Sequence, residues 1–271
     1  MSTRKPKPPP IWTEPAPGTR KPRFSREQIA EVALRIADTE GFDSVSMRRI
    51  ADELGAGTMT LYHYIRTKDD LFALMDDAIM AKVVVAEPLA EDWRAAVTQV
   101  ALGSYRAFRA HPWSIEALRG VRMGPNGFRH FEQSLAAVAN APFDLQGKLD
   151  ILGIVDDYVF GHVFRASEML AERRDFAEGR PSKAILEFTR QMIATGEFPH
   201  TAALTQGRDA ADAWVRIAKF MSDEGRFYRG LDMLLDGIAS AKARPRTETA
   251  ARAASDARDR GASARAKPRR S

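Results

Sequence analysis

The hydrophobic positions of residues 46–68 form two short helical patterns with a glycine turn between them. In the first pattern the apolar residues lie three and four positions apart, at Met47, Ile50, Ala51 and Leu54. This spacing places them on one face of an α-helix. Gly55 then ends the helix, because glycine takes positive φ without a Cβ clash, and Gly57 adds a second permissive position. We therefore expect a sharp turn between two helices.

The second pattern, residues 58–65, is too polar to be a core helix. Only Leu61 and Ile65 suit burial, and hydroxyl, imidazole and aromatic side chains surround them. A helix, a glycine turn and a polar-aromatic helix are the parts of a helix-turn-helix motif, whose second helix enters the major groove of DNA. We expect this surface to be exposed.

Predicted helices flank the motif on both sides. Ser25 and Gln28 have the spacing of a capping box and predict the start of a preceding helix. Thr67 and Asp70 have a similar spacing and predict the start of a following helix. Residues 24–82 therefore form a predicted DNA-binding domain with its connecting helix.

The remaining patterns are also helical and show no strand alternation. Apolar stripes predict helices over residues 93–108, 114–120, 128–138, 145–172, 185–193, 210–221 and 227–238. The expected fold class is all-α: an N-terminal three-helix bundle with a helix-turn-helix, followed by a larger C-terminal helical regulatory and dimerisation domain over residues 83–240. No run of 18 apolar residues occurs, so we expect no membrane span.

Composition limits the class of protein. A chain of 271 residues that is 44% hydrophobic suits one small and one medium domain. It contains no cysteine, which excludes a disulfide framework and thiolate chemistry and fits the cytoplasm, where thiols stay reduced. The N-terminus also lacks the apolar run of a signal peptide.

The charge is concentrated at the ends of the chain. Of the net charge of +5, residues 1–23 carry +5 and residues 241–271 carry +7, so residues 24–240 carry −7. Residues 1–23 also hold seven prolines, and we expect both tails to be disordered. Basic arms beside a DNA-reading helix can lie along phosphates or in a minor groove, or they can serve only as solubilising ends. Both interpretations remain open.

Several short runs resemble the signature of the tetracycline-repressor (TetR) family. They are Ser46-Met-Arg-Arg-Ile-Ala, Leu54-Gly55, Thr60-Leu61-Tyr62-x-Tyr64 and Lys68-x-x-Leu71. In the second half, Gly124-Pro125-Asn126-Gly127, Asp156-Asp157-Tyr158-Val159 and Gly230-Leu231-Asp232 resemble the same family. The resemblance implies an all-α regulatory domain, a homodimer and a ligand cavity.

The same resemblance implies roles in DNA binding, position by position. Base readers would be Arg48, Thr58, Met59 and Tyr62, and phosphate contacts would be Thr60, Tyr64 and Lys68, with His63 in either role. Arginine pairs bidentately with guanine, and a methionine can contact a thymine methyl group. For Tyr62 and Tyr64, core packing is the alternative.

A homodimer is also expected on physical grounds. Residues 145–172 and 225–240 are apolar on more than one face and contain glycines, so one chain would not cover them all. Packing against their copies makes a four-helix bundle with a two-fold axis, and a symmetric dimer reads a palindromic operator in double-stranded DNA. The alternative is that the glycines mark only close packing within the chain.

A small-molecule effector of unknown identity is expected in the C-terminal domain. The candidate ligand-binding residues are Tyr105, Trp113, Met123, Phe128, Phe131, Asp156, Tyr158 and His162. They suit an apolar or aromatic molecule with polar anchors, although each could simply belong to the core. The five histidines show no paired or clustered spacing, so we expect no metal site and no cofactor.

These features predict a ligand-responsive transcriptional regulator, a repressor released from its operator by the effector. One alternative is a nonspecific nucleic-acid-binding protein that acts through its basic tails. Another is a small-molecule-binding enzyme, which is disfavoured because the chain has no cysteine, no Gly-x-Ser-x-Gly, no phosphate loop and no His-Glu-x-x-His. We expect no enzymatic activity.

Overall fold

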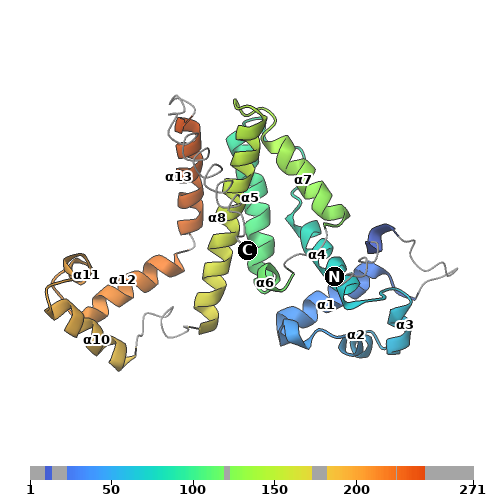
Figure 1. The fold of residues 1–271 in the computed structure, drawn as a ribbon, viewed down its shortest axis with the longest axis horizontal. Helices are drawn as coiled ribbons and strands as arrows, with labels where there is room; N and C mark the ends of the chain where they lie inside the picture. The colour runs from blue at the N-terminus through green and yellow to red at the C-terminus, as the bar shows by residue number, and fades with distance from the viewer. Residues whose placement is uncertain (1–9, 14–22, 119–122, 173–181, 224, 242–271) are drawn as a thin grey trace, which may run out of the picture. The chain divides into compact units, whose positions relative to one another are not determined.

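The computed structural model describes residues 10–13, 23–118, 123–172, 182–223 and 225–241 (Figure 1). Throughout these residues the regular structure is helical, which confirms the predicted all-α class. By its internal contacts the chain divides into residues 1–231 and residues 232–271. The contacts described below lie within residues 1–231.

The first helices form the predicted small bundle. It contains α1 (Arg26–Glu40), the 3₁₀ turn η2 (Phe42–Ser44), α2 (Met47–Glu53) and α3 (Thr58–Tyr62). The predicted capping box at Ser25 and Gln28 is present, and Gly41 follows the last turn of α1. The core consists of fully buried aliphatic side chains, which are Ile29, Leu34, Ile36, Ile50, Leu61 and Ile65.

Helix α4 (Lys68–Val83) connects this bundle to the rest of the molecule. Its N-terminal end begins beside the helix-turn-helix, and Thr67 caps it by accepting a hydrogen bond from the Asp70 backbone N–H, as predicted. Along its length α4 contacts α1, α5 (Trp93–Ala110) and α7 (Pro125–Ala137) (Figure 1). Helix α4 is therefore in contact with the N-terminal bundle through α1 and with the C-terminal helices through α5 and α7.

Most of the C-terminal helices follow the predicted segments, but the short helix Pro199–Ala203 was not predicted. They are α5, α6 (Ser114–Ala117), α7, α8 (Leu145–Glu172), α10 (Lys183–Ala194), α11 (Pro199–Ala203), α12 (Ala210–Ser222) and α13 (Gly225–Ala241). Helix α5 packs on α4, α7 and α8. Proline at the start of α7 lacks the backbone N–H that a helix interior needs, and α7 begins there, three residues earlier than predicted.

Residues 10–13 differ from the expected disordered arm. Ile11–Thr13 form a 3₁₀ turn, η1, and Ile11 is 1% exposed. The Arg26 guanidinium donates a hydrogen bond of 3.1 Å to the Ile11 carbonyl. Burial of this isoleucine and the hydrogen bond to its backbone fix the turn among the prolines. Arg23, the last residue of the predicted arm, is also described, whereas residues 1–9, residues 14–22 and the predicted C-terminal tail after residue 241 lie outside the described residues.

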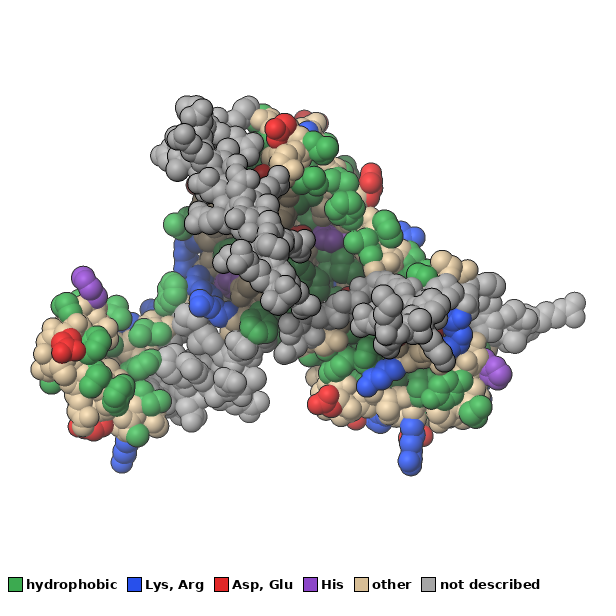
Figure 2. All heavy atoms as spheres, in the orientation of Figure 1, with side chains coloured by type: hydrophobic (Ala, Val, Ile, Leu, Met, Phe, Trp, Pro, Cys, Tyr) green, Lys and Arg blue, Asp and Glu red, His purple; other side chains and the backbone are tan. Residues whose placement is uncertain are grey.

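Helices α10 to α12 contact one another and carry many exposed hydrophobic side chains (Figure 2). The most exposed are Phe188, Phe220 and Val215, at 61%, 55% and 51%. None of the helices in the described ranges is both long enough and apolar enough to cross a membrane.

Candidate DNA-binding surface and ligand pocket

The turn between α2 and α3 is built by glycine, as predicted. Gly55 has φ +60°, a conformation in which most side chains are strained, and the Ala56 N–H donates to the Ala51 carbonyl at 2.9 Å. Gly57 then occupies the N-cap position of α3. The Arg23 guanidinium donates to the Gly55 carbonyl at 2.9 Å, so the segment before α1 also holds this turn.

Helix α3 divides into a buried and an exposed face. Leu61 and the following Ile65 are 0% exposed, as predicted, whereas Met59 is 74% and Tyr62 45% exposed. Thr58 and Thr60 are partly exposed, and His63 is exposed at the end of the helix. The face that is free in the folded chain is therefore the one that the motif would present to DNA.

Two neighbouring arginines at the start of α2 have different environments. Arg48 is exposed and has no ion-pair partner among the described residues. The Arg49 guanidinium lies 2.6 Å from the Glu40 carboxylate and 2.8 Å from that of Glu53. Hydrogen bonds to Glu40 and then Glu53 raise the pKa of Arg49 above its ordinary value. Arg48 is thus available for DNA, while Arg49 holds α2 against α1.

Tyr64, predicted to contact phosphate with core packing as the alternative, lies in the core of the folded chain. It is 7% exposed, its hydroxyl lies 3.4 Å from the Phe24 backbone N–H, which donates to it, and the two rings meet edge to face. The Tyr64 carbonyl accepts a further hydrogen bond of 3.2 Å from Arg26. Tyr64 therefore anchors the start of α1 and belongs to the core.

Lys68 is exposed at the first turn of α4, as a phosphate contact requires. Its ammonium lies 5.1 Å from the centre of the Phe72 ring. Phe72 in turn lies against Phe42, with ring centres 4.9 Å apart, and Phe42 stacks on Trp113 at 5.3 Å. A row of aromatic rings thus joins the start of α4 to the end of α5.

Asp38 ties the end of α1 to the same place. Its carboxylate accepts a hydrogen bond of 2.8 Å from the Trp113 indole and lies 2.8 Å from His111 Nδ1. Trp113 was a predicted ligand-binding residue, but its ring is held by Asp38 and Phe42. Trp113 joins the segment after α5 to α1 and η2, and it does not line the pocket.

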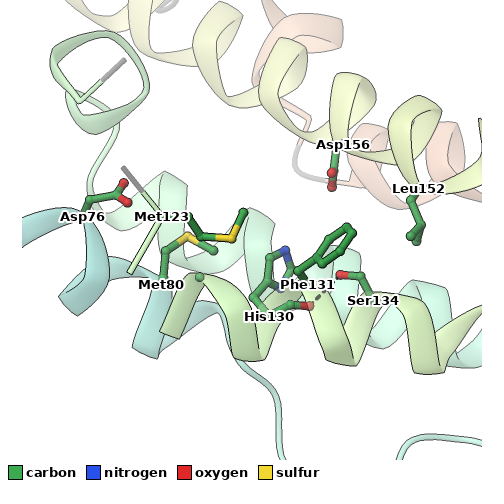
Figure 3. Close-up of a pocket in the computed structure, with 9 residues that line it drawn as sticks. Asp76, Met80, Met123, His130, Phe131, Ser134, Leu152 and Asp156 are labelled. Atoms are coloured by element: carbon green, nitrogen blue, oxygen red, sulfur yellow. Dashed lines mark hydrogen bonds between the residues drawn. The ribbon is translucent and has the colours of Figure 1, made fainter. Parts of the chain in front are cut away.

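A pocket of about 280 Å³ lies between α4, α7 and α8 (Figure 3). The described residues that line it are Asp76, Met80, Met123, Gly127, His130, Phe131, Ser134, Leu152 and Asp156. Three of them, Met123, Phe131 and Asp156, were predicted as ligand-binding residues. Asp76, Met80 and His130 were missed, because a polar or flexible residue on a helix is more often part of its solvated face.

The polar groups of this pocket differ in exposure, since Asp76 and His130 are partly exposed and Asp156 is exposed. Desolvation is the larger cause of a raised pKa for Asp76 and for Asp156, each to about 6. The adjacent carboxylate, Asp77 for Asp76 and Asp157 for Asp156, adds to the shift. Burial lowers the pKa of His130, whose Nδ1 is buried without a hydrogen-bond partner in the described chain. Near neutral pH, the pocket therefore combines a neutral imidazole with two incompletely stabilised carboxylates.

Asp77, the neighbour of Asp76, fastens α4 to the start of α7. Its buried carboxylate accepts hydrogen bonds from the Asn126 backbone N–H at 2.7 Å and from the Asn126 side-chain amide at 2.8 Å. Gly124 is required beside it, because a Cβ there would collide with the Asp77 carboxylate and lie 2.7 Å from the Trp12 ring. One wall of the pocket is thus joined to α4 by hydrogen bonds.

Four other predicted ligand-binding residues lie outside the pocket. Tyr105, Tyr158 and His162 cluster around Phe227, with the Tyr105 and Phe227 rings stacked at 3.9 Å. The Tyr158 hydroxyl donates to the Phe227 carbonyl at 2.9 Å. Desolvation lowers the pKa of His162 and raises that of Tyr158. Phe128 is 63% exposed on α7 and lines no described cavity.

The pocket brings together no set of metal ligands. In the parts of the chain with described positions, no three His, Asp or Glu side chains are grouped closely enough to hold an ion. The site therefore offers apolar contacts, hydrogen bonds and negative charge.

Two family profiles match this chain. Residues 29–75 match the profile described as "Bacterial regulatory proteins, tetR family". Residues 87–241 match "Tetracyclin repressor-like, C-terminal domain". The two matches include the helix-turn-helix and the pocket residues from Met123 to Asp156, whereas Asp76 and Met80 lie between the two matched ranges.

Relatives and solved structures agree with these matches. The HTH-type transcriptional repressor DrrR1 of Streptomyces coeruleorubidus is 29% identical over 234 residues, 85% of this chain and 83% of that protein. An HTH-type transcriptional regulator of Saccharopolyspora erythraea is 30% identical over 238 residues, 85% of this chain and 91% of its own. The structure of ActR, a TetR family protein of Streptomyces coelicolor, in complex with (S)-DNPA is 25% identical with a TM-score of 0.60, and the match covers 82% of this chain and 99% of ActR.

Proposed function

Because this chain belongs to the tetR family of bacterial regulatory proteins and is a DNA-binding transcriptional regulator, we propose that it represses transcription as a homodimer on a palindromic operator and is released by a small-molecule effector. The observation that carries the proposal is the division of α3 into a fully buried Leu61 and an outward face with Met59 and Tyr62. A folded chain that leaves these side chains bare has a surface available for DNA.

Within this surface, Arg48 on α2 and Thr58, Met59 and Tyr62 on α3 read the bases. Arg48 is the residue suited to bidentate pairing with guanine, since its charge is not neutralised by a described partner. Thr60 and Lys68 contact phosphates, and His63 contacts either. Tyr64 acts from the core by holding α1 beside the motif.

The dimer is formed by α8 and α13, each packing against a second copy. Ile154 on α8 is 43% exposed, and a Cβ at Gly153 or Gly161 would meet nothing within 4 Å. Met233 on α13 is 73% exposed. Such surfaces are stabilised when a two-fold partner covers them, and two-fold symmetry places the recognition helices about 34–36 Å apart.

The effector acts through α4. Asp76 and Met80 on this helix line the pocket, and Lys68 at its start faces the DNA. A ligand that shifts α4 changes the position of the motif, and a coupling of about 1–3 kcal/mol gives roughly 5- to 150-fold relief of repression. The solved complex of ActR with (S)-DNPA supports the proposal that this chain also responds to a small molecule.

The remaining proposals concern the setting of this activity. The DNA-binding domain comprises residues 24–82, the ligand-binding and dimerisation domain residues 83–240, and the basic tails add phosphate attraction. We place the protein in the cytoplasm with its DNA, and we propose no catalytic activity and no cofactor.

The direct test is selection of duplexes that the full-length protein binds from a random pool. We expect a palindromic consensus that gives a defined footprint. The same selection with residues 1–240, which lack the basic C-terminal tail, should return the same consensus. A pool without shared sequence, or binding that disappears with the tail, would support nonspecific binding and contradict the proposed operator.

A further inference from the structure

The pocket has an uneven distribution of charge. Its described lining contains two carboxylates, one imidazole and no lysine or arginine. Figure 3 shows Asp76 at one end of the row of lining side chains, with Asp156 on α8 pointing toward the Phe131 ring on α7. Between the two acids lie thioether and phenyl groups of Met80, Met123 and Phe131. A ligand inside this pocket meets apolar walls and negative charge.

Neither acid has a partner in the part of the chain that the structure describes. Asp76 and Asp156 have no hydrogen-bond or ion-pair partner among the described residues, although Asp77, the neighbour of Asp76, has three hydrogen bonds from Asn126. Partial desolvation raises the pKa values of both acids, although Asp156 remains exposed at the surface, and no described cation offsets this effect. An anionic ligand would increase this electrostatic cost, whereas a cation would offset it.

The other walls define the body of the ligand. Met80, Met123, Phe131 and Leu152 offer apolar and polarisable contacts. An aromatic face also attracts a cation, so Phe131 and Asp156 together suit a charged group placed between them. The volume of about 280 Å³ admits a compact molecule of about two fused rings. The unpaired His130 Nδ1 is available for one hydrogen bond.

We propose that the effector is an organic cation, a compact aromatic or alicyclic molecule whose protonated amine pairs with Asp156 across from Phe131. This inference rests on the proposed function, since it names the chemical class of the effector at the same pocket. Charge-assisted hydrogen bonds in such a site are stronger than neutral ones, so we expect the charged form of a ligand to bind at least about tenfold more tightly than its neutral analogue.

The test uses three fluorescent probes of nearly equal size: 1-naphthylmethylamine, 1-naphthylmethanol and 1-naphthoate. They are titrated against the full-length protein in a buffer with chelator, which removes divalent cations. We expect the amine to bind about tenfold or more tightly than the alcohol, and the carboxylate to bind most weakly. Equal affinities for amine and alcohol, tighter binding of naphthoate, or no binding of the amine would each overturn the proposal.

Variants of the two adjacent acids on α8 locate the interaction. Asp156→Asn keeps the size of the side chain and should remove the preference for the amine over the alcohol. Asp157→Asn removes the same charge one residue along the helix, at a side chain that does not line the pocket, and should keep the preference. Unchanged discrimination in Asp156→Asn, with both variants melting as cooperatively as the native protein, would overturn the assignment.

Failure of this inference and failure of the proposed function are distinguishable. If the random pool returns a palindrome but the amine shows no preference, the repressor function stands and the ligand class is wrong. If the amine binds with the expected preference but the pool returns no operator, the ligand class stands and the proposed function is wrong.

Discussion

Tyr62 and Tyr64 lie two positions apart but have opposite environments. Tyr62 is 45% exposed and Tyr64 7% exposed. Sequence motifs alone predicted DNA contact for both, with core packing as the alternative. What separates them is Phe24, which lies 40 residues earlier and covers Tyr64 through its backbone N–H and ring. The exposure of an aromatic side chain depends on such distant contacts, which local periodicity does not report.

Arg48 is predicted to read one base pair in each half-site. Arg48→Ala should relax the preference at that position at a cost of about 1–3 kcal/mol, because a bidentate contact to guanine is lost. The measurement is the affinity for the selected operator and for its single-base variants. Arg49→Ala is the matched control, since Arg49 is engaged by Glu40 and Glu53 and should leave discrimination unchanged.

Lys68 is predicted to contact phosphate and to carry no sequence information. Lys68→Ala should weaken binding to all duplexes alike and lower the slope of log affinity against log salt by about one. Titrations of operator and unrelated duplex at several salt concentrations check this. A loss confined to the operator would contradict the phosphate role.

Asp76 is predicted to lower the stability of the protein above its pKa. Burial raises this pKa from 3.8 to about 6, so the folded state binds the proton more tightly than the unfolded state. The stability that the folded state gains from binding this proton more tightly is fully present below about pH 4. It is lost as the pH rises through about 6. Asp76→Asn should therefore increase the free energy of unfolding by about 1–3 kcal/mol near pH 8 and change it little near pH 4.

Urea unfolding at the two pH values measures this difference. If Asp76→Asn raises the free energy of unfolding equally at both pH values, the effect comes from packing. That result would contradict the prediction that the ionised Asp76 carboxylate destabilises the fold. Stabilisation by removal of a pocket residue is consistent with a site kept for binding at a cost in stability.

At the scale of helices, the sequence predicted starts and stops well. Ser25 and Thr67 cap α1 and α4 as expected, because a capping side chain bonds to a backbone N–H only three residues away. Such local chemistry can be read from the chain. The turn η1 was missed, because Ile11 is buried in the folded chain and its carbonyl is held by Arg26, 15 residues later in the sequence.

The pocket was predicted only in part for the same reason. On α4 the apolar stripe faces the core, and Asp76 lies outside this stripe, where a carboxylate is expected to meet water. Packing of α7 against that side of α4 turns Asp76 into a pocket residue. Asp156 and Phe131 were found because the resemblance and the aromatic content marked their segments.

The link between α4 and α7 gives a prediction at this scale. Asn126→Ala removes two side-chain hydrogen bonds to Asp77 and leaves its buried carboxylate partly unsatisfied. We expect the free energy of unfolding to fall by about 1–3 kcal/mol. We also expect the effector to cause a smaller loss of operator affinity than it causes in the native protein. Unfolding and operator titrations with and without effector measure the two effects. Asn140→Ala, at an exposed site after α7, is the control and should change neither.

For the whole molecule, the exposed face of α8 predicts the oligomeric state. Ile154→Glu places a charge on the proposed two-fold interface, where it occurs twice, and should raise the dimer dissociation constant by about tenfold or more. Sedimentation velocity over a range of concentrations measures this constant. Val215→Glu, the matched change on the exposed surface of α12, should leave the dimer intact. An unchanged dimer in Ile154→Glu would exclude this face as the interface.

The buried position of Ile11 has a practical consequence for shortened versions of this protein. A version that starts at Arg23 appears from composition to lose only a proline-rich leader, but it also loses a side chain that is 1% exposed. Emptying such a site costs about 2–5 kcal/mol, a large share of the stability of an ordinary domain. Weak expression of a shortened version would then indicate that the core has lost the Ile11 side chain. A purification tag is therefore better added before Met1 than used to replace residues 1–22.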